Sequence, residues 1–227
     1  MDFWPADYEE SWTLAKPFSR KGVGLHSGED SEVCIKPSDF EGFHVRLVNH
    51  QDSPVTLNLS QIRYSPLCTT FELGKHRLST VEHLLAAFAG CGLTHVQIEV
   101  TGDEIPLLDG SSKCWVEAIK DAGIVRAKTP RKPSPTIREP IFINRGQSLI
   151  NAVPSQRFKL VGIIDFSYEA IGRQIFSIEL NPDNFIREIA PARTFGFVDQ
   201  VDELKKAGLI KGGALENALV CNGKSWV

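Results

Sequence analysis

The chain of 227 residues is 42% hydrophobic and 23% charged, a composition typical of a globular protein with one large domain or two modest ones. Its net charge of −3 and its short basic runs, which carry no interleaved aromatic residues, argue against nucleic-acid binding. The five cysteines are widely spaced and form no C-x-x-C motif, which argues against a disulfide framework or a cysteine-rich zinc site and favours a reducing compartment.

The start of the chain and its hydropathy bear on localisation. The segment "MDFWPADYEE" is acidic and lacks the apolar core of a signal peptide and the Arg/Ser richness of a transit peptide. The cytoplasm is therefore expected, with a mitochondrion or plastid as the alternative for a eukaryotic source. No apolar run approaches the ~20 residues of a membrane span, so any membrane contact would be peripheral. We expect a monomer.

From Trp12 onward the pattern predicts strands interrupted by glycines. "GVGLHSG" is typical of a turn, and "SEVCIKPS", "HVRLVNH" and "CTTFEL" of strands. A helix is expected to begin after Leu78, with Ser79 and Glu82 forming an S-x-x-E capping box, and to end at glycine. "THVQIEV" alternates as a half-buried strand with His95 on its polar face.

A second helix, "KCWVEAIKDAG", completes the first half. Its predicted core stripe consists of Trp115, Ala118, Ile119 and Ala122. Several strands with two helices indicate an α+β layer arrangement, which we assign to a first sandwich domain over residues 12–125.

The segment from 126 to 136 contains prolines and basic residues without apolar periodicity, which predicts a linker. Beyond it, residues 137–227 predict a second α+β domain. Its strands are expected in "IREPIFINRG", "FKLVGIIDF" and "QIFSIEL", and in "LIKGGALENALVC" near the end. Two helices are expected, one capped by Asn181 with Pro182 at its first position and one from about Asp199 to Ala207. We predict two-layer α+β sandwiches related by a pseudo-repeat, the second incomplete.

Glu82 and His83 stand side by side in the first helix, and two interpretations of each are open. Glu82 is a helix-capping residue or a general base. His83 is a buried, hydrogen-bonded histidine or a zinc ligand. It shares its helix face with Ala86, Ala87 and Gly90, a small-residue face that lets a second layer or a ligand approach closely.

Five motifs occur in order: "GVGLHSG", "LSTVEHLLAAFAG", "EIPLLDGS", "APARTFGF" and "GLIKGGALENALV". With them the chain resembles UDP-3-O-acyl-N-acetylglucosamine deacetylase, a zinc amidase of lipid A biosynthesis, from about Trp12 to its end. The resemblance implies two packed α+β sandwiches with the active site between them, and hydrolysis of the N-acetyl group of an acylated sugar nucleotide.

The resemblance also implies residue roles. His83 would be a zinc ligand, Glu82 the general base, and Thr194 a residue that polarises the scissile carbonyl. Phe195 would line the site. The segment 194–220 resembles the family's insert, which shapes a passage for the acyl chain. Suitable wall residues are Leu204, Leu209, Ile210 and Ala214, for which an ordinary core role is the alternative.

The chain departs from the family pattern at the metal. The family's two further zinc ligands, from an H-K-x-x-D-type motif, and a later histidine are absent, because all six histidines precede the linker. His26 and Asp30 have a metal-like spacing, but in a turn this spacing gives no shared face. His26 lines the substrate cleft or is simply solvated. One imidazole is too few for tight zinc binding, so the chain is expected to be weakly active or inactive.

Three hypotheses follow from this departure. The chain is the larger N-terminal part of a zinc-dependent deacetylase, truncated at its C-terminus. Alternatively, it is a non-catalytic form that binds the acylated sugar nucleotide or regulates a full-length copy. The third hypothesis is an incomplete product without function.

Overall fold

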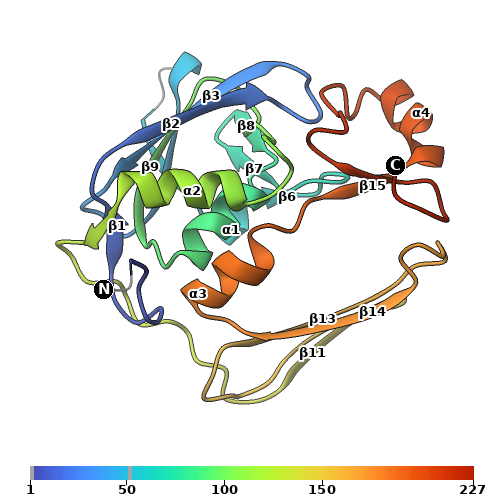
Figure 1. The fold of residues 1–227 in the computed structure, drawn as a ribbon. Helices are drawn as coiled ribbons and strands as arrows, with labels where there is room; N and C mark the ends of the chain where they lie inside the picture. Colours follow the sequence, from blue (N-terminus) through green and yellow to red (C-terminus); the bar gives the residue numbers. More distant parts are fainter. Residues whose placement is uncertain (1–2, 51–52) are drawn as a thin grey trace.

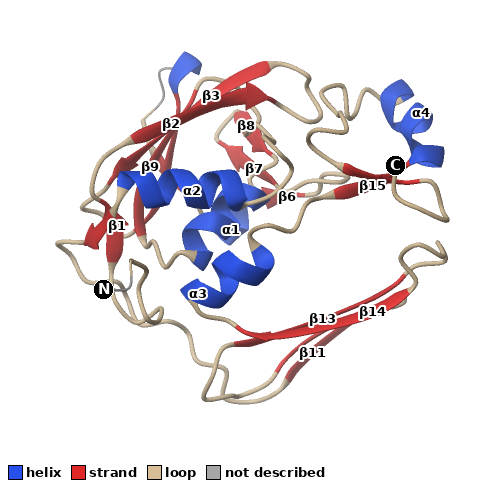
Figure 2. Cartoon of the chain, viewed as in Figure 1, coloured by secondary structure: helices blue, strands red, loops and turns tan. Residues whose placement is uncertain are grey.

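The computed structural model describes residues 3–50 and 53–227 (Figure 1). Strands and helices occupy separate layers, which confirms the predicted α+β class (Figure 2). No helix in the described ranges has both the length and the apolar character needed to cross a bilayer. The relationship between the two halves by a pseudo-repeat stays a prediction, as do the proposed domain boundaries.

The first half is built on a seven-stranded sheet. Its central strand β9 (His95–Val100) runs antiparallel to β3 and parallel to β4. The other members are β1 (Trp12–Leu14), β2 (Phe18–Val23), β3 (Asp30–Pro37), β4 (Gly42–Leu47), β5 (Val55–Thr56) and β10 (Ile124–Arg126). A separate three-stranded sheet contains β6 (Ile62–Arg63), β7 (Thr70–Leu73) and β8 (His76–Ser79), and short 3-10 turns cover Val48–His50 and Leu59–Gln61.

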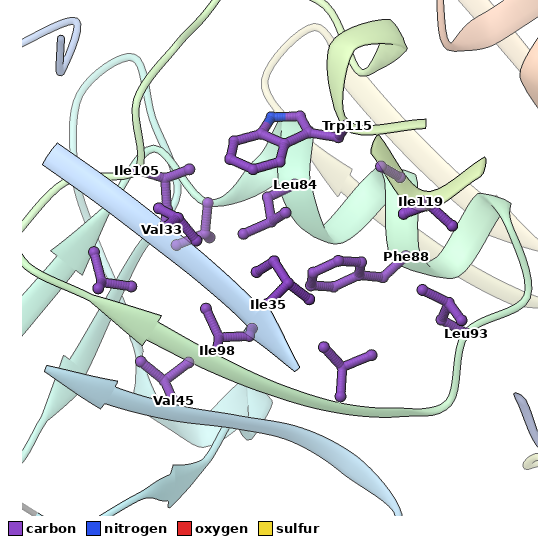
Figure 3. Close-up of a cluster of buried hydrophobic side chains, with 14 of the residues drawn as sticks. Val33, Ile35, Val45, Leu84, Phe88, Leu93, Ile98, Ile105, Trp115 and Ile119 are labelled. Carbon is purple, nitrogen blue, oxygen red and sulfur yellow. The ribbon is translucent and has the colours of Figure 1, made fainter. Parts of the chain in front are cut away.

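Helices α1 (Glu82–Gly90) and α2 (Lys113–Ala122) lie together on one face of this sheet. Figure 3 shows Phe88 of α1 and Trp115 of α2 pointing toward the sheet residues, and both are fully buried. The predicted stripe of α2 is confirmed, since all four of its members are buried. Each large apolar side chain buried here contributes about 1.5–3 kcal/mol, so this layer is the main core of the molecule.

The predicted capping box at the start of α1 is wrong. Ser79 is the last residue of β8, and the residue before the helix, Val81, makes no capping hydrogen bond with its side chain. Thr80 between them has a φ of +57°, a conformation unfavourable for a β-branched residue. The chain therefore turns sharply from strand to helix, which places Glu82 at the first helical position.

The small face of α1 admits a second structural layer, as expected. α3 (Pro182–Asn184) continues into a π-helical turn (Phe185–Ile189), and a Cβ at Gly90 would lie 2.2 Å from Cδ1 of Phe185. The predicted cap of this segment is confirmed, because the side chain of Asn181 accepts a hydrogen bond from Asn184 N at 2.8 Å. Glycine at position 90 thus lets the second half of the chain pack on α1.

The expectation for His95 is wrong in one respect. His95 is completely buried rather than on a solvated face. Its imidazole is hydrogen-bonded to the hydroxyl groups of Thr94 and Thr129, at 2.8 and 3.0 Å. Thr129 belongs to the segment after β10, and its hydroxyl donates to Asp39 O at 2.6 Å. The segment expected to be a linker therefore packs at this end of the sheet, where β3 ends and β9 begins.

The second half contains two hairpins, one formed by β11 (Ile141–Arg145) and β12 (Ser148–Ala152), the other by β13 (Lys159–Asp165) and β14 (Arg173–Glu179). Figure 1 shows them apart from the helices of the first half. The neighbouring residues Phe142 and Ile143 point to opposite faces of their strand, and both side chains are more than half exposed. Both faces of these ribbons are therefore largely uncovered.

The chain ends with β15 (Phe195–Phe197), α4 (Val198–Lys206) and β16 (Leu219–Cys221). β15 and β16 are parallel neighbours. The predicted final helix is confirmed to within one residue at each end. The predicted strand in "LIKGGALENALVC" is confirmed only for its last three residues. The preceding glycine-rich stretch instead forms turns that reach the first half.

Candidate active site

The carboxylate of Glu82 is fixed by a strand, although it stands at a helix N-terminus. Its Oε2 accepts a hydrogen bond from Thr69 N at 3.0 Å. Thr69 immediately precedes β7, so this bond ties the helix start to the small sheet. The carboxylate that sequence reasoning assigned to a cap or to a base is thus held by a neighbouring element.

His83 follows on α1 and is partly buried. Burial lowers the pKa of its imidazole, and the negative charges of Glu82 and Asp109 oppose this effect without cancelling it. The ring is therefore neutral at pH 7, which is the form that binds metals or accepts a hydrogen bond. The backbone carbonyl of His83 accepts a hydrogen bond from Ser112 Oγ at 2.9 Å, which joins α1 to the start of α2.

Asp109 is the second carboxylate of this site, beside Glu82, and the sequence analysis did not single it out. Burial raises its pKa, but hydrogen bonds from the hydroxyl and amide of Ser111 outweigh burial and hold the pKa below its usual range. The Ser111 hydroxyl lies 2.8 and 3.0 Å from the two carboxylate oxygens. The motif "EIPLLDGS" contained the signal: an aspartate before Gly-Ser at the foot of a helix.

Thr194 comes from the second half and attaches to the same loop. Its amide donates to Gly110 O at 2.7 Å, and its carbonyl accepts from Leu219 N at 3.0 Å. A Cβ at position 110 would lie 2.0 Å from Asn217 O, and the φ of +80° is one that favours glycine. Glycine at position 110 therefore leaves room for Asn217, and beside it Thr194, to pack against the loop that carries Asp109.

A buried carboxylate, Glu104, organises the turn that carries His26. Its oxygens accept hydrogen bonds from His26 N at 2.9 Å, Ser27 N at 2.8 Å and the Thr80 hydroxyl at 2.7 Å. Burial raises the pKa of Glu104, but these bonds outweigh burial and hold the pKa below its usual range. Glu104 thus links the His26 turn to the residue that directs the chain into α1.

His26 and Glu104 line a pocket of about 360 Å³, whereas Glu82, His83 and Thr194 are not among its lining residues. Leu209 lines it, and Ile210 N donates to Nδ1 of His26 at 3.5 Å. The structure thus brings together His26, Leu209 and Ile210, three residues that the sequence predicted for substrate binding, although Ile210 itself does not line the pocket. The full lining is His26, Ser27, Glu29, Asp30, Ser31, Ser65, Pro66, Cys68, Ser79, Gly102, Asp103, Glu104, Leu209 and Lys211.

Two other expected lining residues lie elsewhere. Phe195 belongs to an aromatic cluster, with ring centroids 5.7 Å from Phe166 and 6.0 Å from Trp226. Leu204 lies on α4, where its carbonyl accepts from Leu209 N at 2.9 Å. Neither is among the pocket's lining residues, and their contact with an acyl chain stays a prediction.

The residues that could hold a metal do not form a complete site. Within residues 3–50 and 53–227, no three His, Cys, Asp or Glu side chains are grouped to hold an ion. His83 has the neutral imidazole that zinc requires, but His83 and the carboxylates near it do not form a group of three ligands. The spacing of His26 and Asp30 gives no site either. The described residues therefore do not fit a zinc ion by themselves.

Comparison with known proteins gives consistent matches. The family model LpxC, UDP-3-O-acyl N-acetylglycosamine deacetylase, matches residues 11–227. A protein of Thermosynechococcus vestitus named UDP-3-O-acyl-N-acetylglucosamine deacetylase is 41% identical over 217 residues, covering 95% of this chain and 75% of that protein. Proteins of the same name from Trichormus variabilis and Nostoc sp. are 42% and 43% identical over 221 residues, covering 95% of this chain and 79% of each relative.

Proposed function

The chain belongs to the UDP-3-O-acyl-N-acetylglucosamine deacetylase family, and we propose on this basis that it is a hydrolase acting on UDP-3-O-acyl-N-acetylglucosamine. The reaction removes the N-acetyl group, releases acetate and leaves a free amine, a step of lipid A biosynthesis. The observation that carries the proposal is the match over nearly the whole chain, together with Glu82, His83 and Asp109 gathered at one loop and one helix start.

Glu82 acts as the general base in this proposal. Its Oε2 is occupied by Thr69 N, so we assign Oε1 to the water that attacks the acetyl carbonyl. A base must lie within hydrogen-bond reach of the proton that it takes. The hydrogen bond from Thr69 limits rotation of the carboxylate and keeps Oε1 aimed in one direction, which supports this role.

Thr194 supplies a hydrogen bond to the oxygen of the scissile carbonyl. Two backbone hydrogen bonds, to Gly110 and from Leu219, hold this residue in place. A donor that is fixed before the reaction stabilises developing negative charge without a reorganisation cost. The hydroxyl then stabilises the oxyanion that forms as water adds.

Family membership implies zinc, and His83 would be one ligand. A catalytic zinc is normally held by three protein ligands, whereas no such group exists among the residues that the structure describes. We therefore propose that the 227-residue chain holds zinc weakly and turns substrate over slowly. Bound zinc would polarise the acetyl group and acidify a water.

The acyl chain of the substrate is assigned to the insert of residues 194–220. Leu209 lines the pocket and Ile210 lies beside His26, and Phe195 and Leu204 come earlier in the same insert. The sugar nucleotide would then contact the His26 turn while the acyl chain follows the apolar residues of the insert.

The test is a deacetylation assay on the purified chain with added zinc, in which mass spectrometry detects the free-amine product. We expect slow product formation that the Glu82→Gln variant abolishes. Glu117→Gln, an exposed change on α2, is the matched control and should leave the rate unchanged. Equal rates for the native chain and Glu82→Gln would refute the assignment. One tightly held zinc ion per chain would contradict the proposal that this chain lacks a complete set of zinc ligands.

A non-catalytic role is the second candidate, favoured by the incomplete metal set. In this case the chain binds the acylated sugar nucleotide without hydrolysing it. Calorimetry with the intact substrate separates the two: heat of binding with no product after long incubation supports the binding role, and product formation rules it out.

A further inference from the structure

A cysteine and a histidine face the same pocket beside the proposed active site. Cys68 is partly exposed and lines the pocket of about 360 Å³ together with His26. Its Sγ lies 3.2 Å from the Ser65 hydroxyl and 3.6 Å from the Thr70 hydroxyl. The Nε2 atom of His26 is buried and has no hydrogen-bond partner of normal geometry among the described residues.

The surroundings of this thiol favour its charged form. Burial opposes ionisation, but the nearby imidazole of His26 and the hydrogen bonds with Ser65 and Thr70 outweigh it and lower the pKa of Cys68 to about 7. The same interaction with Cys68 raises the pKa of His26. Each of the two groups therefore favours the charged form of the other, and a thiolate that forms near neutral pH is the nucleophilic state of cysteine.

We propose that Cys68 is a covalent modification site, at which the sulfur attacks small electrophiles and low-molecular-weight disulfides that enter this pocket. The proposal rests on the cavity and on the cluster of groups around Sγ. It does not depend on the deacetylase reaction, because the modification is measured on the protein itself.

The other four cysteines lack this combination of features. Cys91 and Cys221 are completely buried. Burial and the nearby Asp109 carboxylate raise the pKa of Cys114. Cys34 is partly exposed but lies in the middle of β3, which is paired on both sides. Cys34 is therefore the matched control: its side chain is partly exposed, as is that of Cys68, but it does not line the pocket that contains His26.

The charges around the pocket select among reagents. Carboxylates outnumber cations in its lining: Glu29, Asp30, Asp103 and Glu104 face it together with His26 and Lys211, and Glu82 also acts on the charge of His26. Neutral or positively charged reagents should therefore react faster than anionic ones, relative to their rates with a free thiol.

The exchange with a cationic disulfide, cystamine, is balanced without a further oxidant. The Cys68 thiolate attacks one sulfur of cystamine, the reagent's S–S bond breaks, and a mixed disulfide forms on Sγ. The other half leaves as the cysteamine thiolate, which takes up a proton from solvent. Excess dithiothreitol reverses the step.

The experiment treats the native full chain with limiting iodoacetamide and locates the label by peptide mass spectrometry. We expect Cys68 to be labelled first, Cys68→Ser to lose this label, and Cys34→Ser to keep it. The ratio of the alkylation rate with iodoacetamide to that with iodoacetate should be larger at Cys68 than for free cysteine. Cystamine should form one reversible adduct. Labelling that favours Cys34, or that spreads evenly over the partly exposed cysteines, would overturn the proposal.

The pH profile of alkylation tests the role of the imidazole. The rate at Cys68 should rise with a midpoint near pH 7, and in His26→Gln the midpoint should move toward ~8.5, the value of an isolated thiol. Ser65→Ala, which removes one hydrogen bond to Sγ, should raise the midpoint by a smaller amount and serves if His26→Gln fails to fold. Identical midpoints in the native chain and in a folded variant of His26 would show that His26 does not influence the Cys68 thiol.

Discussion

Removing the Glu104 carboxylate gives the sharpest test of how the site is held together. In Glu104→Ala, three donors lose their acceptor: His26 N, Ser27 N and the Thr80 hydroxyl. A buried donor left without a partner costs about 1–3 kcal/mol. Because the His26 turn borders an open pocket, where water can replace part of each bond, we take the lower part of this range.

Three donors at about 1 kcal/mol or slightly more each give a loss of about 3–4 kcal/mol for Glu104→Ala. Glu104→Gln keeps one oxygen but turns an amide N–H₂ group toward a backbone donor, so we expect about 1–2 kcal/mol. Glu117→Ala, on the exposed side of α2, should change the stability by less than about 0.5 kcal/mol.

The assay is urea unfolding followed by tryptophan fluorescence, since Trp115 is completely buried in the core of the first half. The effect also depends on pH with a defined sign. The pKa of Glu104 is held below its usual value in the folded state, so the stabilisation is fully present above the unfolded-state pKa of ~4.3 and is lost as the pH falls through the folded-state pKa. A loss below 1 kcal/mol, or an unchanged difference between variant and native protein in acid, would refute the reasoning.

Three further predictions concern single positions. Glu82→Gln should lower any deacetylation rate by about 10²-fold or more while the melting temperature, read by circular dichroism, stays within a few degrees; a rate near the native one would exclude the base role. Gly90→Ala should destabilise by about 1–3 kcal/mol in urea despite its better helix propensity, because the new Cβ meets Phe185, and adding Phe185→Leu should restore part of the loss; a stabilised single variant would contradict the close packing. Burial lowers the pKa of His95, so its contribution to stability is complete above the unfolded-state pKa of ~6.5 and declines as the pH falls below it; His95→Gln should flatten the stability curve below pH ~6.5, and an unaltered curve would count against a neutral, buried ring.

Local patterns in the sequence were sufficient to predict most elements of the first half. The stripe of α2 and the small face of α1 follow from helical periodicity, and both are confirmed by the buried Trp115 and by the contact between Gly90 and Phe185. The cap formed by Asn181 was also predictable, because it depends only on residues three positions apart.

The site could be predicted only in part, because its contacts join distant segments. The S-x-x-E pattern predicted a capping box, but Ser79 belongs to a strand, and the chain turns sharply at Thr80, where φ is positive. The partner of Glu82 is instead Thr69, thirteen positions earlier in the chain. Glu104 meets His26 across 78 positions. Periodicity reports on which face a residue occupies, and it carries no information about which remote backbone group will meet it.

The uncovered ribbons of the second half have a consequence for how the protein behaves in solution. Isolated two-stranded hairpins are only marginally stable in water, and those formed by β11–β14 present apolar side chains such as Phe142 and Ile163 to solvent. Backbone amides there should exchange with deuterium far sooner than those of the enclosed strand β9. Proteases should cleave these hairpins first, fluorescent apolar dyes should bind to them, and concentrated samples should begin to self-associate through them.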